Sequence, residues 1–311
     1  MSAIIERQEE DVKRSSSWQV WWRLLRPHTL TAAFIPVLIG TMLGLLHGEF
    51  HLLLFLAMFI ASVFIQVATN MFNEYYDYKR GLDTKESVGI GGAIVRDGVE
   101  PIVVLRLGFI LFAVSLLIGV YISAATSWWI AGVGAVSMAA GYFYTGGPYP
   151  IAYTPFGEIV SGFFMGFIII LISFFIQTGT VTAESVLISV PISILCGAIL
   201  TANNIRDREG DAKNGRRTLA ILLGHENSIK FLAIMFGFSY IWVVGMVAAG
   251  YGSLWLLLVF LSVPKAIQAA KRFVGKTRPI DMMPAMKSTA QLHTLFGLLV
   301  SIGLFMEYIL S

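Results

Sequence analysis

The sequence predicts an all-α, polytopic membrane protein with nine transmembrane helices. Of its 311 residues, 56% are hydrophobic and only 13% are charged, and the mean hydropathy is +0.75. Soluble domains carry about 25% charged residues, so this composition excludes an ordinary soluble protein. Nine apolar runs, most of them close to the ~20 residues that a spanning helix needs, give the helix count.

The nine runs, in chain order, cover residues 30–46, 51–72, 102–123, 128–144, 156–177, 186–202, 231–249, 254–264 and 292–310. The eighth is the weakest, because Pro264 and Lys265 interrupt it. Residues 1–17 are polar and of mixed charge, unlike a cleaved signal peptide. The stretch W-Q-V-W-W-R-L-L-R (18–26) suits a membrane interface, with Trp at headgroup level. We therefore expect a tail and interfacial segment at 1–28 and one nine-helix domain at 29–311.

The positions of the basic residues support the count and predict the orientation. If nine spans alternate, the tail and the segments after the second, fourth, sixth and eighth runs share one side of the membrane. All 22 Lys and Arg fall there, counting Arg106 at the start of the third run with the segment before it. By the positive-inside rule that side is cytoplasmic. We expect a multi-pass protein of the plasma membrane with its N-terminus in the cytoplasm.

Composition also limits the partners. The net charge of +3 is too small to indicate a nucleic-acid partner, whereas the apolar runs require a lipid bilayer. The single cysteine, Cys196, lies inside an apolar run, so no intrachain disulfide can form. No feature of the sequence identifies a protein partner.

The stretch N-N-I-R-D-R-E-G-D-A-K-N-G-R-R-T (203–218) follows the sixth run and predicts a functional site. Asn203, Asp207 and Asp211 are spaced i, i+4 and i+8, so on a continuing helix they share one face. Carboxylates near a bilayer are costly and usually mark a function. Taken alone, the stretch could instead be a solvated helix end with local capping.

A second stretch, N-E-Y-Y-D-Y-K-R-G-L-D, repeats the arrangement after the second run. Here the oxygen-bearing residues are Asn73, Asp77 and Asp83, and Gly81 is expected to end the helix before Asp83. Two acidic clusters with basic neighbours predict a site for divalent cations and a diphosphate. Mg²⁺ fits, because it binds oxygen through a few carboxylates plus substrate phosphates. The predicted metal ligands are Asp77, Asp83, Asp207 and Asp211.

Basic residues beside the two clusters could contact the phosphates directly. The candidates are Lys79, Arg80, Lys213, Arg216 and Arg217, although charge at the cytoplasmic membrane edge would also explain Arg216 and Arg217. Between the clusters, Y-T-G-G-P-Y-P-I-A-Y-T-P-F-G-E (144–158) contains no Lys or Arg. Its Gly and Pro predict a turn, and its tyrosines predict an aromatic surface near the site. Glu158, at the end of this turn, could either cap the next helix or take part in chemistry.

These motifs carry a resemblance that covers essentially the whole chain. N-x-x-x-D-x-x-x-x-x-D after the second run and N-x-x-x-D-x-x-x-D-x-x-x-G-R-R-T-L after the sixth resemble the paired motifs of UbiA-type intramembrane aromatic prenyltransferases. One departure is that Asp83 lies ten residues after Asn73, where many members have eight. R-P-H-T-L (26–30), G-G-A-I-V-R-D-G (91–98) and Y-T-G-G-P (144–148) are similar to the 1,4-dihydroxy-2-naphthoate polyprenyltransferases of menaquinone biosynthesis.

The resemblance implies a fold and an activity. The nine helices would enclose a central cavity with the acidic motifs at its cytoplasmic mouth. The implied reaction is Mg²⁺-dependent transfer of a polyprenyl group from polyprenyl diphosphate to 1,4-dihydroxy-2-naphthoate, with decarboxylation, giving demethylmenaquinone. The implied catalytic residues are Asn73, Asp77, Asn203, Asp207 and Asp211. Acceptor binding or stabilisation of the allylic cation would involve Arg26, His28, Tyr142, Tyr144 and Tyr149, tyrosine faces acting through cation–π attraction.

Two alternatives remain open from the sequence. The same chemistry could serve another aromatic acceptor, such as 4-hydroxybenzoate or homogentisate. A cation-coupled transporter would also place carboxylates in a membrane protein. Transporter sites, however, usually lie near the bilayer midplane at broken helices, whereas these carboxylates follow the apolar runs.

Overall fold

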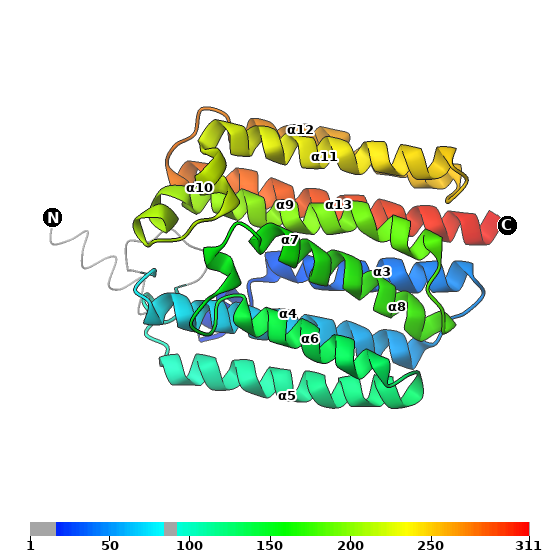
Figure 1. The fold of residues 1–311 in the computed structure, drawn as a ribbon, viewed down its shortest axis with the longest axis horizontal. Helices are drawn as coiled ribbons and strands as arrows, with labels where there is room; N and C mark the ends of the chain where they lie inside the picture. Colours follow the sequence, from blue (N-terminus) through cyan, green and yellow to red (C-terminus); the bar gives the residue numbers. More distant parts are fainter. Residues whose placement is uncertain (1–16, 84–91, 311) are drawn as a thin grey trace, which may run out of the picture.

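The computed structural model describes residues 17–83 and 92–310, and these form a bundle of helices lying side by side (Figure 1). The polar tail at 1–16 and residues 84–91 lie outside the described residues, and Gly91 is the first residue of G-G-A-I-V-R-D-G. Among the described residues there is no strand. The elements are α2 Ser17–Leu25, α3 Pro27–Leu46, α4 Leu52–Lys79, α5 Pro101–Ala125, α6 Trp129–Phe143, η1 Ile151–Tyr153, α7 Gly157–Ser161, η2 Gly162–Ile168, α8 Ile169–Thr178, α9 Ala183–Lys213, α10 Leu219–Leu223, α11 His225–Ala248, η3 Leu254–Ser262, α12 Val263–Lys271 and α13 Pro279–Leu310.

Eight helical segments of the described chain are long and apolar enough to cross a membrane. The ninth, α6, is apolar but has only 15 residues. Each of the nine predicted runs therefore corresponds to a helical segment, and the all-α membrane class is confirmed. The eighth begins as a 3₁₀ helix and becomes α12 at Val263, so Pro264 falls in a first helical turn, where a missing N–H costs little.

The two helices that carry the acidic motifs extend well beyond the predicted apolar runs. α9 has 31 residues and α4 has 28, which correspond to roughly 46 and 42 Å at 1.5 Å per residue. A hydrocarbon layer is only about 30 Å thick, so their last turns reach past it. Both C-terminal ends lie at the same end of the bundle as α2 and α10 (Figure 1). Asp77, Asp207 and Asp211 are thus helical but lie beyond the length that a hydrocarbon layer covers.

The largest core cluster joins α3, α8, α9, α11 and α13, with side chains such as Ile192, Phe174 and Phe296 fully buried. The segment η2 is a π-helix that crosses α9 closely. A Cβ at Gly166 would lie 2.3 Å from the Cα of Ser193, so only glycine permits this approach. π-helical turns are frequent at functional sites, and η2 forms one wall of the cavity described below.

A smaller cluster holds the motif-bearing end of the bundle together. It contains Val20 and Leu24 of α2, Val67 and Met71 of α4, and Ala93 and Ile94 of the segment before α5. The exposed rings of Trp18 and Trp22 stack at 6.0 Å on the outer side of α2. This arrangement supports the interfacial placement expected for 18–26.

Candidate active site

The two acidic motifs meet through one arginine. The Nη2 of Arg216 lies 2.8 Å from Oδ1 of Asp77, and its Nη1 lies 3.1 Å from Oδ1 of Asp211. The guanidinium also lies over the Tyr153 ring, 5.1 Å from its centroid. Burial by itself would lower the pKa of Arg216, but Asp77 and Asp211 outweigh that effect and raise it. Arg216 is therefore a fixed cation between the motifs.

The other two aspartates have different surroundings. Asp207 accepts two hydrogen bonds from its neighbour Arg206, at 2.6 Å from Nε and 2.5 Å from Nη2. Asp83 follows the helix end at Gly81, whose φ of 71° suits glycine, as expected. Burial and then the nearby Asp77 and Glu74 carboxylates raise the pKa of Asp83 to about 6. Perturbed pKa values of this kind are most frequent at functional sites.

The donor set fits a divalent cation that substrate phosphates help to hold. Within the described residues, no three His, Cys, Asp or Glu converge into a closed metal site. Mg²⁺ does not need one, because it commonly binds through one or two carboxylates plus phosphates and water. The Oδ2 of Asp211 is buried without a hydrogen-bond partner, and buried polar atoms rarely remain so. The residues present are thus compatible with the predicted ion.

One helical turn deeper than the aspartates, Asn73 and Asn203 line a cavity. Asn73 Oδ1 accepts a hydrogen bond of 2.7 Å from Thr145 Oγ1, in the turn after α6. Because α4 and α9 continue through the motifs, Asn73 and Asp77 share one face of α4, and Asn203, Asp207 and Asp211 share one face of α9, as their spacing predicts. The asparagines face the cavity, whereas Asp77 and Asp211 face Arg216 at its mouth.

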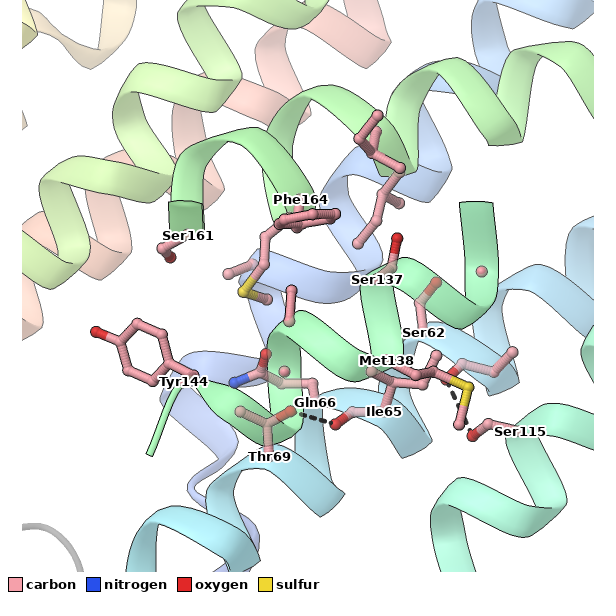
Figure 2. A pocket seen from close by; sticks show the side chains of 18 of the residues that line it. Ser62, Ile65, Gln66, Thr69, Ser115, Ser137, Met138, Tyr144, Ser161 and Phe164 are labelled. Atoms are coloured by element: carbon pink, nitrogen blue, oxygen red, sulfur yellow. Dashed lines mark hydrogen bonds between the residues drawn. The ribbon is translucent and has the colours of Figure 1, made fainter. Parts of the chain in front are cut away.

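The cavity has a volume of about 270 Å³ and is mostly apolar (Figure 2). Its motif end includes Arg26, Asn73, Tyr144 and Asn203, and its lining on α4 continues to Met58. Asn73 and Met58 are 15 residues apart, or roughly 22 Å along the helix. Deeper walls come from α5, α6, η2 and α8, including Leu116, Gly119, Ile122, Ile130, Ala135, Phe164 and Ile172. An apolar cavity this long suits a lipid-like tail whose polar end lies at the motifs.

The predicted tyrosines separate into three environments. Tyr144 lines the cavity, where its ring faces the space beside Ser161 and Gln66 (Figure 2). Burial first, and then the Glu158 carboxylate, raise the pKa of Tyr144, so it remains a neutral phenol. Tyr142 is instead bonded to Tyr76, with 2.6 Å between the hydroxyl oxygens. Tyr149 is 90% exposed and is not among the residues that line the cavity.

The predicted basic residues also differ in position. Lys213 and Arg217 are exposed beside the motif on α9, and Lys79 lies over the Tyr75 ring at 6.0 Å. The Arg80 guanidinium, in contrast, is hydrogen-bonded within the protein. Its Nη1 donates to the carbonyl of Thr145 and its Nη2 to that of Gly147, at 2.8 Å for the latter. Arg80 therefore tethers the turn after α6, a role that the sequence did not suggest. The side chain of His28 lies outside the described part of the structure.

Two buried carboxylates were not assigned to the site from sequence. Glu158 is 4% exposed and accepts a 2.8 Å hydrogen bond from Asn204 Nδ2, which ties α7 to α9. Glu74 is 1% exposed and pairs with Arg26 at 3.2 Å. Glu74 lies three residues before Asp77, as Arg80 lies three after it, so all three project from one region of α4. The spacing from Asp77, which is visible in the sequence, could therefore have indicated that Glu74 lies near the site.

The fold and site together define an integral membrane protein that presents carboxylates and arginines to the head of an amphiphile and an apolar cavity to its tail. The chain belongs to the UbiA prenyltransferase family, whose model matches residues 33–296. It is 58% identical to the 1,4-dihydroxy-2-naphthoate octaprenyltransferase of Bacillus subtilis (strain 168), over 95% of each chain. It is 28% identical to the protein of that name from Escherichia coli (strain K12), over 96% of this chain and 98% of that one.

Solved structures share the fold. An apo UbiA homologue from Aeropyrum pernix K1 superposes with a TM-score of 0.67 at 17% identity, covering 90% of this chain and 98% of that one. A UbiA homologue from Archaeoglobus fulgidus, bound to GPP and Mg²⁺, gives a TM-score of 0.62 at 16% identity over 91% and 99%. The predicted family and helical architecture are therefore confirmed.

Proposed function

We propose that this protein transfers a polyprenyl group from polyprenyl diphosphate to 1,4-dihydroxy-2-naphthoate, in a Mg²⁺-dependent reaction that yields demethylmenaquinone in its reduced, quinol form. The observation that carries the proposal is the long apolar cavity that starts at the paired Asn–Asp motifs. The 58% identity with the Bacillus subtilis octaprenyltransferase supports the acceptor. The Archaeoglobus fulgidus homologues bound to DMAPP or GPP with Mg²⁺ support the donor class and the ion.

We assign the diphosphate head to the mouth of the cavity. Asp77, Asp207 and Asp211, with Asp83, would hold Mg²⁺, which when bound neutralises charge that develops on the leaving diphosphate. Arg216 already lies between the motifs, and the exposed Lys79, Lys213 and Arg217 surround them. These cations would hold the diphosphate oxygens through charge-assisted hydrogen bonds. Asn73 and Asn203 would orient the adjoining allylic carbon at the cavity entrance.

The acceptor belongs beside the cavity end that contains Arg26 and Tyr144. Arg26 lines the cavity and is the cation placed to hold the carboxylate of an aromatic acid. The neutral Tyr144 ring can stabilise the allylic cation through its face, and the apolar walls exclude water that would quench it. The ring carbon that carries the carboxylate bonds to the prenyl carbon. Carbon dioxide then leaves, and its bonding electron pair restores the aromatic ring.

The direct test uses purified protein in detergent with Mg²⁺ and a polyprenyl diphosphate. We expect 1,4-dihydroxy-2-naphthoate to be prenylated, with release of diphosphate and carbon dioxide, and mass spectrometry identifies the product. A much faster reaction with 4-hydroxybenzoate or homogentisate would contradict the proposed acceptor but not the reaction type. Product formed without any membrane gradient excludes a transporter.

We further propose that the motifs face the cytoplasm and that the host membrane is the plasma membrane, because all 22 Lys and Arg fall on one predicted side. Single cysteines test this in a Cys196→Ala background. Cysteine in place of the exposed Asn214 or Lys276 should be protected from an impermeant thiol reagent in intact cells. Cysteine in place of the exposed Thr180, in the turn between α8 and α9, should react. The opposite labelling pattern would reverse the orientation.

A further inference from the structure

Both carboxylate oxygens of Glu74, at the motif end of the bundle, are hydrogen-bonded within the protein. Its Oε1 accepts hydrogen bonds from the backbone N–H of Gly92 at 2.7 Å and of Ile94 at 3.3 Å. Its Oε2 lies 3.0 Å from the same Gly92 nitrogen and 3.2 Å from Nη2 of Arg26. Only 1% of Glu74 is exposed. A buried charge is stable only when it is paired and hydrogen-bonded in this way.

These contacts argue against a metal-binding role for Glu74, although its position in N-E-Y-Y-D would be consistent with one. Both of its oxygens are used within the protein, by a guanidinium and by backbone donors. Asp77, one turn later, is 20% exposed and faces the opposite motif through Arg216. A metal at Glu74 would have to displace three partners, whereas a metal at Asp77 displaces one. Glu74 therefore belongs to the framework of the site.

The partner of Glu74 is held in an unusual conformation. Arg26 has a φ of 51° and is the only non-glycine residue with positive φ among the described residues. Such a conformation is unfavourable for a residue with a Cβ and persists where the surroundings fix it. Thr29 contributes to fixing it by donating backbone and hydroxyl hydrogen bonds to the Arg26 carbonyl, at 2.8 and 2.9 Å. The strain indicates a required position for the side chain.

Arg26 also has hydrogen-bond donors available for a ligand. Its guanidinium offers five N–H donors, of which Glu74 takes one, and its Nε is buried without a partner. The residue lines the motif end of the cavity. A single arginine can therefore bond Glu74 and a ligand carboxylate at the same time.

We propose that Glu74 is a positioning residue for the acceptor. It fixes the guanidinium of Arg26 at the cavity and pins the Gly92–Ile94 segment beside it. This inference rests on the proposed function, because the acceptor is taken to be an aromatic acid. Loss of Glu74 should weaken the use of the acceptor carboxylate specifically, leaving use of the diphosphate substrate and of Mg²⁺ nearly unchanged.

The test compares Glu74→Gln with the wild type in steady-state kinetics and in equilibrium binding of 1,4-dihydroxy-2-naphthoate. Glutamine keeps the size and one acceptor oxygen but removes the charge that faces Arg26. We expect the acceptor KM and Kd to rise at least about tenfold. The KM for the polyprenyl diphosphate and the half-saturating Mg²⁺ concentration should change by less than about twofold. A double variant with Arg26→Gln should be little worse than Arg26→Gln alone, because the two residues act through one contact.

Two controls make the result specific. Glu100→Gln changes an exposed carboxylate just before α5 and should leave every parameter unchanged. Binding of 1,4-dihydroxynaphthalene, which lacks the carboxylate, should be equal in Glu74→Gln and wild type. If the wild type neither binds nor prenylates the naphthoate, the proposed function fails; if it does both and Glu74→Gln leaves the acceptor KM unchanged, the present inference fails. A raised Mg²⁺ requirement would make Glu74 a metal ligand instead.

If Glu74→Gln does not fold, Glu74→Asp is used in the same assays. Aspartate keeps the charge but shortens the side chain by one methylene, which withdraws it from Arg26 and Gly92. An acceptor-specific rise in KM supports the inference. A loss of kcat with unchanged KM for both substrates would contradict the inference and would show that the role of Glu74 is purely structural.

Discussion

Replacing Asp77 or Asp207 with asparagine is expected to lower turnover at least about a hundredfold, with the protein still folded. Asparagine keeps the size of the side chain and a hydrogen-bond acceptor for Arg216 or Arg206. It removes the charge that we propose holds Mg²⁺ against the diphosphate, and the metal supplies several kcal/mol of transition-state stabilisation. Each 1.36 kcal/mol is tenfold in rate. Turnover across a Mg²⁺ titration, beside a melting curve, measures both properties.

The double variant Asp77→Asn/Asp207→Asn should be much less impaired than the product of the two single losses predicts, because both residues are proposed to serve one bound diphosphate. Asp281→Asn is the matched control, since Asp281 is a partly exposed aspartate that pairs with Arg278 at 2.8 Å, at the start of α13. It should retain normal turnover. A well-folded Asp207→Asn protein with wild-type rates would show that the aspartates are not metal ligands and would remove the basis of the proposed mechanism.

The helical architecture could be predicted because lipid imposes a simple rule on sequence. A spanning helix must be apolar over about 20 residues, and each of the nine runs met that condition closely enough to be found. The helix ends were harder, because polar residues can continue a helix outside the bilayer. α13 thus begins at Pro279, 13 residues before the predicted run at 292, and passes through Pro284. α4 and α9 likewise continue through their motifs.

The sequence predicts which site residues share a helix face, because spacing alone determines that. It does not predict which residues they contact, because that depends on the tertiary structure. Asn203, Asp207 and Asp211 share a face because α9 continues, and the i, i+4, i+8 spacing predicts that much. The partners of each charge depend on which loops meet at the end of the bundle. No local pattern predicts that Arg80 tethers Gly147 or that Glu74 pins Gly92. These contacts join segments 67 and 18 residues apart in the chain.

The last two turns of α4 thereby join the segments around the site. Glu74 binds Arg26 and the segment before α5, Asp77 binds Arg216 after α9, and Arg80 binds the turn after α6. Three residues at i, i+3 and i+6 fix four different parts of the chain relative to the cavity mouth. Precise positioning of this kind is what a site needs when its chemistry consists of holding a diphosphate and an acceptor in contact.

Arg216→Gln should lower both the stability of the metal-free protein and the rate of the reaction. Asp77 and Asp211, 20% and 8% exposed, would then face each other without the cation that now separates them. Breaking such a pair costs roughly 3 kcal/mol, the low end for buried pairs, because Asp77 retains some solvent. We expect a lower melting temperature without Mg²⁺ and a fall in turnover of about tenfold to a hundredfold from the lost phosphate contact.

Mg²⁺ distinguishes this electrostatic effect from general damage to the fold. A divalent cation supplies the charge that Arg216 provided, so adding Mg²⁺ should raise the melting temperature of Arg216→Gln more than that of the wild type. Turnover should stay low, because the ion cannot replace the arginine on the diphosphate. Arg208→Gln, on α9 and eight residues before Arg216, is the control, since the pair of Arg208 with Glu209 is exposed and 3.4 Å long. If Arg216→Gln melted like the wild type with and without Mg²⁺, the bridge between the two motifs would contribute nothing to the metal-free protein.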